Sequence, residues 1–120
     1  MIEKDIKSVK DLDVFKLSHD VALEIYKLTL TFPKGETYGL VSQLRRCCVS
    51  INSNLVEGAG RASSGEFKQF IGIARGSAAE LEYQIEISRD LEYIEEKKAK
   101  ELIVKTNRIL MMLSKLLKSI

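Results

Sequence analysis

The residues with the greatest chemical capability are two cysteines and a single histidine. Cys47 and Cys48 are adjacent, and neighbours on a helix point about 100° apart, so the two thiols are poorly placed to form a disulfide with each other. With His19 as the only histidine, the chain lacks the spaced Cys and His ligands of a zinc site. His19 lies beside Asp20, away from the apolar stripe of its helix and without a patterned nucleophile. We therefore predict reduced thiols that act as small core residues, with no metal, no cofactor and no catalytic site.

A stripe of polar side chains follows the second predicted helix. It consists of Gln43, Arg46, Ser50, Asn54, Glu57 and Arg61. Successive members are three or four residues apart, so on an α-helix they share one side about 80° wide, next to the apolar stripe. One interpretation is a solvated face, in which a pair such as Glu57 with Arg61 contributes only tenths of a kcal/mol. The other is a buried polar seam, within the bundle or at a subunit interface, whose groups satisfy one another and set the helix register.

The composition of this stripe favours the seam. A face built only for solvent is usually rich in Lys and Glu, whereas the stripe uses Asn, Gln, Ser and Arg, which suit directed hydrogen bonds. The spacing by itself leaves both interpretations open.

Small residues recur on the third predicted helix. They are Gly72, Gly76 and Ala79. A glycine inside a helix costs about 1 kcal/mol relative to alanine, so the two glycines predict close packing against a neighbouring backbone. Glu80 follows one turn after Gly76 and is a candidate partner for Arg46, with an exposed glutamate as the alternative.

Basic side chains provide a second candidate surface. The net charge is only +2, from 19 Lys and Arg against 17 Asp and Glu, which does not by itself indicate a nucleic-acid-binding protein. The last 28 residues are more basic, with seven basic and three acidic side chains. Candidate contacts to phosphate groups of RNA or DNA are Arg45, Arg61, Lys105, Arg108, Lys115 and Lys118.

Four helices must position these side chains. Apolar residues recur at three- and four-residue steps over 13–31, 38–59, 63–91 and from Glu95 onward. We expect Asp13 to cap the first helix, and Ser63 with Glu66 to form a capping box at the start of the third. Pro33 ends the first helix, and Gly58 and Gly60 are signals that end the second.

The connections between these helices are short, which predicts antiparallel neighbours. The expected fold is therefore all-α: residues 1–120 form one antiparallel up-down-up-down four-helix bundle. The N-terminal residues lack the apolar core of a signal peptide, and no apolar run reaches the ~20 residues that span a bilayer. We expect a cytoplasmic protein with no membrane segment.

An ordered set of residues resembles the bacterial four-helix bundle protein family, first noticed as products of intervening sequences in 23S ribosomal RNA genes. The matching positions include 38–46, Ser50, Ile51, Asn54, 57–61, Glu66, Phe67, Phe70, Gly76, Ser77 and 80–82. Upstream, 11–12, 14–15, Tyr26, 28–29 and 32–33 also match. The resemblance covers nearly the whole chain and is far more specific than a short motif.

The resemblance implies a left-to-right four-helix bundle, which in known members assembles into a ring-like homopentamer. The accessory variability determinant of diversity-generating retroelements looks like a basic relative of this family that binds nucleic acid and its reverse transcriptase, and the near-neutral charge of the present chain weakens the carry-over of nucleic-acid binding. No enzymatic activity is attached to the family. The shared polar positions match Arg46, Ser50, Asn54, Glu57 and Arg61, which favours the seam. The chain departs from the family at the adjacent cysteines, where alanines are common, and at Phe15, where tryptophan is usual.

Two functional hypotheses follow. The first is a non-enzymatic homo-oligomeric scaffold, with the chain itself as its partner. The alternative is a nucleic-acid-binding accessory module that uses a basic face of the oligomer.

Overall fold

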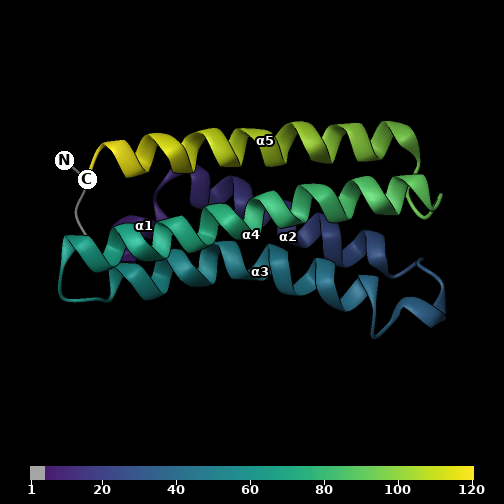
Figure 1. Cartoon of the computed structure of the whole chain (residues 1–120), viewed down its shortest axis with the longest axis horizontal. Coiled ribbons are helices and arrows are strands. Elements are labelled where there is room, and N and C mark those ends of the chain that lie inside the picture. Colours follow the sequence, from purple (N-terminus) through teal and green to yellow (C-terminus); the bar gives the residue numbers. More distant parts are fainter. Residues whose placement is uncertain (1–4) are drawn as a thin grey trace.

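The computed structural model describes residues 5–120, which form five α-helices and no strand (Figure 1). The α-helices are α1 (Ile6–Lys10), α2 (Asp13–Thr29), α3 (Leu40–Ala59), α4 (Ser64–Asp90) and α5 (Glu96–Lys118), and a 3-10 helix, η1 (Lys34–Glu36), precedes α3. The predicted all-α class is confirmed. In this part of the chain, no helix combines the length and apolar character needed to cross a membrane.

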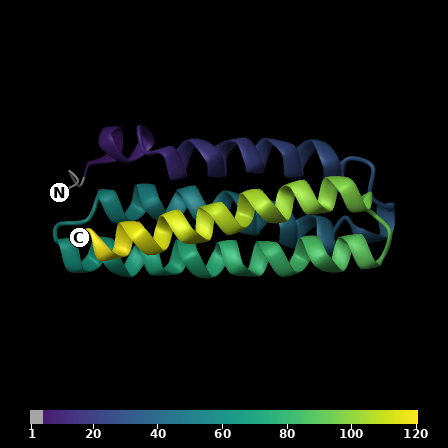
Figure 2. The same ribbon diagram turned by 90° about the horizontal axis from the view of Figure 1, so that it is seen from above.

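The four long helices lie side by side along the longest dimension of the molecule, which measures 43 × 24 × 19 Å (Figure 1). α3 contacts both α2 and α4, and α5 contacts the same two helices. Within residues 5–120, no Cα atom of α2 lies within 8 Å of one in α4, and the same holds for α3 and α5. Figure 2 shows the result, with α2 and α4 on opposite sides of the molecule.

Apolar side chains from all four long helices fill the space between them. The largest fully buried ones are Phe67, Ile25, Leu44, Ile51, Leu55, Ile71, Leu81, Ile85, Leu102, Ile109, Leu113 and Val9. Removing this apolar surface from water is the main stabilising contribution to the fold. Cys47 and Cys48 are buried among these side chains, as predicted for small core residues.

Several helix ends differ from the sequence-based expectation. Asp13 is the first residue of α2 rather than its cap, and the capping position is taken by Leu12, which makes no side-chain cap hydrogen bond. The helix predicted from residue 38 begins at Leu40, because η1 is followed by a turn over residues 37–39. The predicted cap of α4 is present: the Ser63 hydroxyl accepts a hydrogen bond from the Glu66 backbone N–H at 3.2 Å. The short helix α1 was not anticipated.

The turn between α4 and α5 is anchored to the connection between α2 and α3. Glu92 has a left-handed backbone with φ of 64°, and the Tyr93 N–H bonds the Ser88 carbonyl at 2.8 Å, as in a Schellman motif. The Tyr93 hydroxyl then donates to a Glu36 carboxylate oxygen at 2.9 Å, and its ring lies 5.3 Å from that of Phe32. These contacts hold both turns together at one end of the molecule.

A bridge of charged groups joins α2 to α5. The carboxylate of Glu24 accepts hydrogen bonds from Lys98 Nζ at 2.7 Å and Lys105 Nζ at 2.8 Å. Burial alone would raise the pKa of Glu24, but the hydrogen bonds and charges of Lys105 and Lys98 outweigh it and hold the pKa below its ordinary value of 4.5.

Removing this bridge is expected to weaken the protein in a pH-dependent way. Because the folded-state pKa of Glu24 is depressed, its stabilisation is complete above its unfolded pKa and is lost as pH falls through the folded pKa. We expect Glu24→Gln to cost about 1 kcal/mol at neutral pH and much less well below pH 4.5, as measured by urea unfolding at both. An equal cost at both pH values would contradict the assignment.

Candidate functional site: the seam between α3 and α4

The centre of the predicted polar stripe forms a direct hydrogen-bonded link between α3 and α4. The Asn54 amide donates to the Ser50 carbonyl at 2.8 Å and to the Ser50 hydroxyl at 2.9 Å. The Ser50 hydroxyl lies 2.9 Å from that of Ser77 on α4. Ser50 and Asn54 are half-buried, and Ser77 is buried. Here the seam interpretation describes the packing within one chain.

Ser77 is a member of this link that the sequence analysis missed. Its spacing carried the signal, because it lies three residues after Ala74 and four before Leu81, two residues of the buried stripe of α4. A serine at such a position must find a hydrogen-bond partner on the neighbouring helix or its own backbone.

The two ends of the stripe remain exposed to solvent. The Arg46 guanidinium donates to the Gln43 side-chain oxygen at 2.9 Å, and both residues lie on the surface. Arg61 forms a 2.7 Å ion pair with Glu57, with about half of each side chain exposed, and its guanidinium lies over the Phe70 ring. In one chain the stripe therefore has a half-buried centre and solvated ends.

Glu80 was expected to pair with Arg46 or to remain exposed, and the second alternative holds. Glu80 is exposed, and the two residues form no ion pair within residues 5–120. The carboxylate of Glu80 instead lies 3.8 Å from Cys47 Sγ, which also accepts a 3.4 Å hydrogen bond from the Gln84 amide. Arg46 and Glu80 are thus both available to groups outside the chain.

The predicted close packing at the glycines of α4 is wrong within a single chain. A Cβ added at Gly72 or Gly76 would meet no described group within 4 Å, and Ala79 is also exposed. The physical reason is that these residues point away from the other helices, so the missing side chains leave a shallow outer surface.

The close approach occurs instead at Gly58 on α3. A Cβ at this position would stand 2.7 Å from Phe70 Cβ and 3.0 Å from Phe67 Cδ1. The sequence analysis interpreted Gly58 only as a stop signal. Its position seven residues after Ile51, on the buried stripe, was the available clue.

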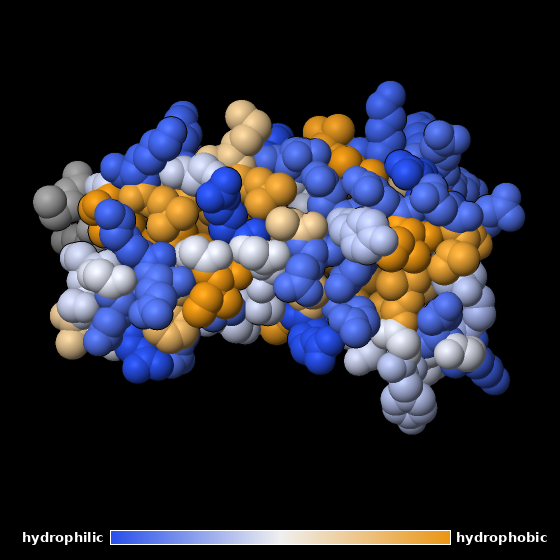
Figure 3. Space-filling model, in the orientation of Figure 1, coloured by the Kyte–Doolittle hydropathy of each residue, from blue (hydrophilic) through white to orange (hydrophobic). Residues whose placement is uncertain are grey.

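Exposed apolar side chains border the small residues of α4. Ile73 is 48% exposed and Tyr83 is 62% exposed. Figure 3 views the side on which α4 lies between α3 and α5, and hydrophobic patches alternate there with blue and nearly white residues. We call the surface of the stripe on α3, together with Gly72, Ile73, Gly76, Ala79, Glu80 and Tyr83 on α4, the α3/α4 face.

The comparison with known proteins identifies the family. The model of the 23S rRNA-intervening sequence protein family matches residues 10–115. The chain belongs to this family. It is also similar to the crystal structure of a protein with unknown function from the S23 ribosomal protein family of Bacteroides thetaiotaomicron, with 25% identity and a TM-score of 0.78, over 88% of this chain and 98% of the other. A search of curated proteins found no match.

The six basic residues predicted for phosphate contact do not form one surface in this family member. Arg45 on α3 donates to Thr29 Oγ1 at 3.0 Å and lies 4.7 Å over the Tyr26 ring, while Lys105 is bound by Glu24 and Arg61 by Glu57. Arg108, Lys115 and Lys118 are exposed on α5, which does not contact α3. Tertiary structure separates the set because α3 and α5 lie diagonally across the molecule.

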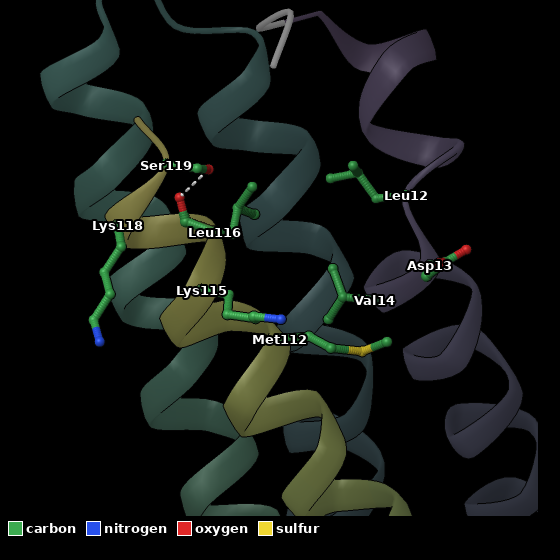
Figure 4. A pocket seen from close by; sticks show the side chains of 8 residues that line it. All are labelled: Leu12, Asp13, Val14, Met112, Lys115, Leu116, Lys118 and Ser119. Atoms are coloured by element: carbon green, nitrogen blue, oxygen red, sulfur yellow. Dashed lines mark hydrogen bonds between the residues drawn. The ribbon is translucent and has the colours of Figure 1, made fainter. Parts of the chain in front are cut away.

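A shallow groove separates the beginning of α2 from the end of α5. Its volume is about 660 Å³, and Leu12, Val14, Met112 and Leu116 supply apolar side chains from both helices, while Lys118 points away (Figure 4). The sequence analysis did not anticipate this groove, because it depends on how two helices distant in the sequence diverge at their ends.

The two thiols have little nucleophilic character. Burial raises the pKa of the Cys48 thiol to about 11, and burial also raises the pKa of Cys47. His19 is exposed on α2, at the rim of a groove of about 400 Å³ that Cys48 also lines. The residues that the structure describes contain no group of three or more His, Cys, Asp or Glu side chains able to hold a metal.

Native Cys48 should therefore react slowly with alkylating reagents. Raising its pKa from 9.0 to about 11 lowers the thiolate fraction near neutral pH about a hundredfold, and burial slows reagent access further. We expect the iodoacetamide reaction of a Cys47→Ala variant to be at least about a hundredfold slower in the native protein than in denaturant at the same pH. Equal rates in the two states would show that Cys48 is neither buried nor perturbed.

Proposed function

We propose that this chain is a non-enzymatic subunit of a homo-oligomeric scaffold, built from an up-down-up-down four-helix bundle. The oligomer is a pentamer, by resemblance to known members of the family, and its subunits meet through the α3/α4 face. A cytoplasmic location remains a prediction from the sequence. The relative of known structure has no assigned function, so the proposal depends on the chemistry of this face.

The observation that supports the proposal is that two exposed charged groups on the α3/α4 face have no ion-pair partner within the described chain. The half-buried link joins Ser50 to Ser77, and exposed Arg46 and Glu80 lie about one helical turn from these serines on α3 and α4. Neither Arg46 nor Glu80 has an ion-pair partner in the described chain. On α4, Gly72 and Gly76 have open space around them. Each glycine destabilises the helix by about 1 kcal/mol relative to alanine, and a face that only meets solvent gains nothing in return. A second subunit covering this face would use the charges and the open space together.

The solution mass, measured by light scattering at micromolar concentration and moderate salt, tests the proposal. Five copies of the 13.6 kDa chain have a mass of about 68 kDa. A monomeric mass would overturn the scaffold, and a dimer or tetramer would overturn the pentamer specifically.

Replacing Asn54 with leucine should damage both the fold and the assembly. The change removes the amide that donates to the Ser50 carbonyl and hydroxyl, and an unsatisfied buried polar group costs about 1–3 kcal/mol. We expect a lower melting temperature and a smaller mass. The matched control is Lys100→Ala, an exposed side chain without an ion pair in residues 5–120. Equal masses and equal melting temperatures for the two variants would show that the stripe is a solvated face.

We propose nucleic-acid binding as the second candidate function, because α5 presents a row of basic side chains. Lys97, Lys100, Arg108, Lys115 and Lys118 are all exposed, and no ion pair of the described chain uses them. At +2 per chain, five copies carry about +10, enough to give an oligomer a basic face where the lysine-rich surfaces align.

Binding to RNA or DNA should be weak, tolerant of sequence and strongly dependent on salt. Phosphate contacts position a ligand without reading its bases, so with about five contacts the affinity should fall by a few orders of magnitude between roughly 50 and 200 mM salt. Isotherms on mixed-sequence RNA and duplex DNA, with Lys100→Gln plus Arg108→Gln as the α5 variant and Arg45→Gln as the control, measure this. No binding at low salt would eliminate the candidate.

A further inference from the structure

The groove between the beginning of α2 and the end of α5, which we call the α2/α5 groove, has an apolar floor. Val14 is 5% exposed and Leu116 9%, and half-buried Leu12 and Met112 complete the floor. The volume of about 660 Å³ lies in the range of small-molecule sites. Because these four side chains offer no strong hydrogen bond, the floor suits the hydrocarbon part of a ligand.

A positively charged side chain reaches over this floor. Figure 4 shows Lys115 extending from α5 toward Val14 and Met112, and all three residues line the groove. Lys115 is exposed and takes part in no ion pair within residues 5–120. Its ammonium group is therefore available to an anion whose apolar part occupies the floor.

The other polar side chains of the α2/α5 groove do not compete for this position. Lys118 points away from the groove, and the carboxylate of Asp13 points away from α5 (Figure 4). The Ser119 hydroxyl donates to the Leu116 carbonyl at 2.8 Å, so its proton is already used. The groove thus combines an apolar floor with one directed positive charge.

This combination restricts the kind of ligand. A nucleotide or a sugar needs several convergent hydrogen-bonding groups, which these side chains do not supply. A specific protein partner uses about 20–30 residues on each side of an interface, whereas eight residues line this groove. A ligand with one hydrocarbon chain and one anionic group matches both features of the site.

We propose that the α2/α5 groove binds a small anionic amphiphile, such as a medium-chain fatty acid. The hydrocarbon chain lies on the floor, where its removal from water drives binding, and the carboxylate pairs with the Lys115 ammonium group. This site lies on α2 and α5, apart from the α3/α4 face, so the inference does not depend on the proposed oligomer.

The two adjacent methionines of α5 provide the test. Met112 lies in the groove, whereas Met111 is 68% exposed and does not line it, so Met111 serves as an internal control. The full chain, labelled at its methionine methyl groups, is titrated with decanoate below the concentration of micelle formation and followed by NMR. Decanol and decylammonium, which have the same chain with a neutral or a cationic head group, are the matched ligands.

We expect decanoate to shift the Met112 methyl signal in a saturable way, to leave that of Met111 in place, and to bind more tightly than decanol or decylammonium. Equal affinities for the three ligands would overturn the role of Lys115. Equal shifts at Met111 and Met112 would indicate unspecific adsorption and overturn the site, as would the absence of any shift at Met112.

Lys115→Glu and Lys118→Glu are the matched variants. Both lysines are exposed in the last turn of α5, so both substitutions remove a similar favourable interaction with the helix dipole. We expect Lys115→Glu to weaken decanoate binding by at least about fivefold and Lys118→Glu to change it by less than about twofold. Circular dichroism melts establish that both variants are folded, and equal affinities would overturn the assigned head-group contact.

The remaining alternative is that a second copy of the chain covers the groove. Light scattering of Met112→Glu and Met111→Glu distinguishes it, since the two substitutions place the same charge inside and outside the groove. We expect both variants to keep the wild-type mass. A lower mass for Met112→Glu alone would assign the groove to a contact between subunits and overturn the small-molecule site.

Discussion

Replacing Gly58 with valine is expected to lower the free energy of unfolding by about 2–3 kcal/mol, the usual range for forcing extra carbons into a packed contact. The first carbon added would stand 2.7 Å from Phe70 Cβ, an atom fixed to the backbone of α4, so α3 and α4 must move apart. Valine has a better helix propensity than glycine by only a few tenths of a kcal/mol, which does not offset the clash.

Urea unfolding followed by circular dichroism measures this loss, and Gly65→Ala is the matched control. Gly65 lies in the first turn of α4, where the nearest described group to an added Cβ is the Ser63 hydroxyl at 3.9 Å, an ordinary contact. The control should be neutral or stabilising by up to about 1 kcal/mol. If both variants unfolded at the same urea concentration as the wild type, α3 and α4 would not approach as closely as the structure requires.

Phe67→Ala is expected to produce the largest loss of stability, about 3–5 kcal/mol. The ring is 1% exposed and lies against Gly58, so truncation removes buried apolar surface and leaves a cavity that a glycine opposite cannot fill. For a domain of this size, the change corresponds to a melting temperature lower by roughly 10–20 °C.

The comparison for this variant is Tyr38→Ala, in which an equally large ring is removed from a side chain that is 97% exposed. Its effect should be below about 0.5 kcal/mol, since exposed groups away from special features contribute little. Phe67→Ala and Gly58→Val should also be non-additive when combined, because the residues are in contact. A small effect of Phe67→Ala would show that the ring is not part of the tight contact.

The sequence alone was sufficient for the four long helices and for most of the side chains that fill the core. Apolar residues such as Val21, Ile51 and Leu81 recur with the helical period, and this period is a local property of the chain. The cap at Ser63 was equally predictable, because its partner Glu66 is three residues away. The family could also be recognised from the sequence, since its motifs are contiguous.

The details of the candidate site depended on tertiary structure, because they are decided by which helices are neighbours. Gly58 and Gly72 are both helical glycines, yet one faces α4 at close range and the other faces outward. Likewise, Lys105 and Arg108 are basic residues about one turn apart, but of these two only Lys105 forms an ion pair with Glu24 of α2. Spacing places a residue on a side of its own helix; burial and pairing depend on what lies opposite, across distances in the sequence that local patterns do not encode.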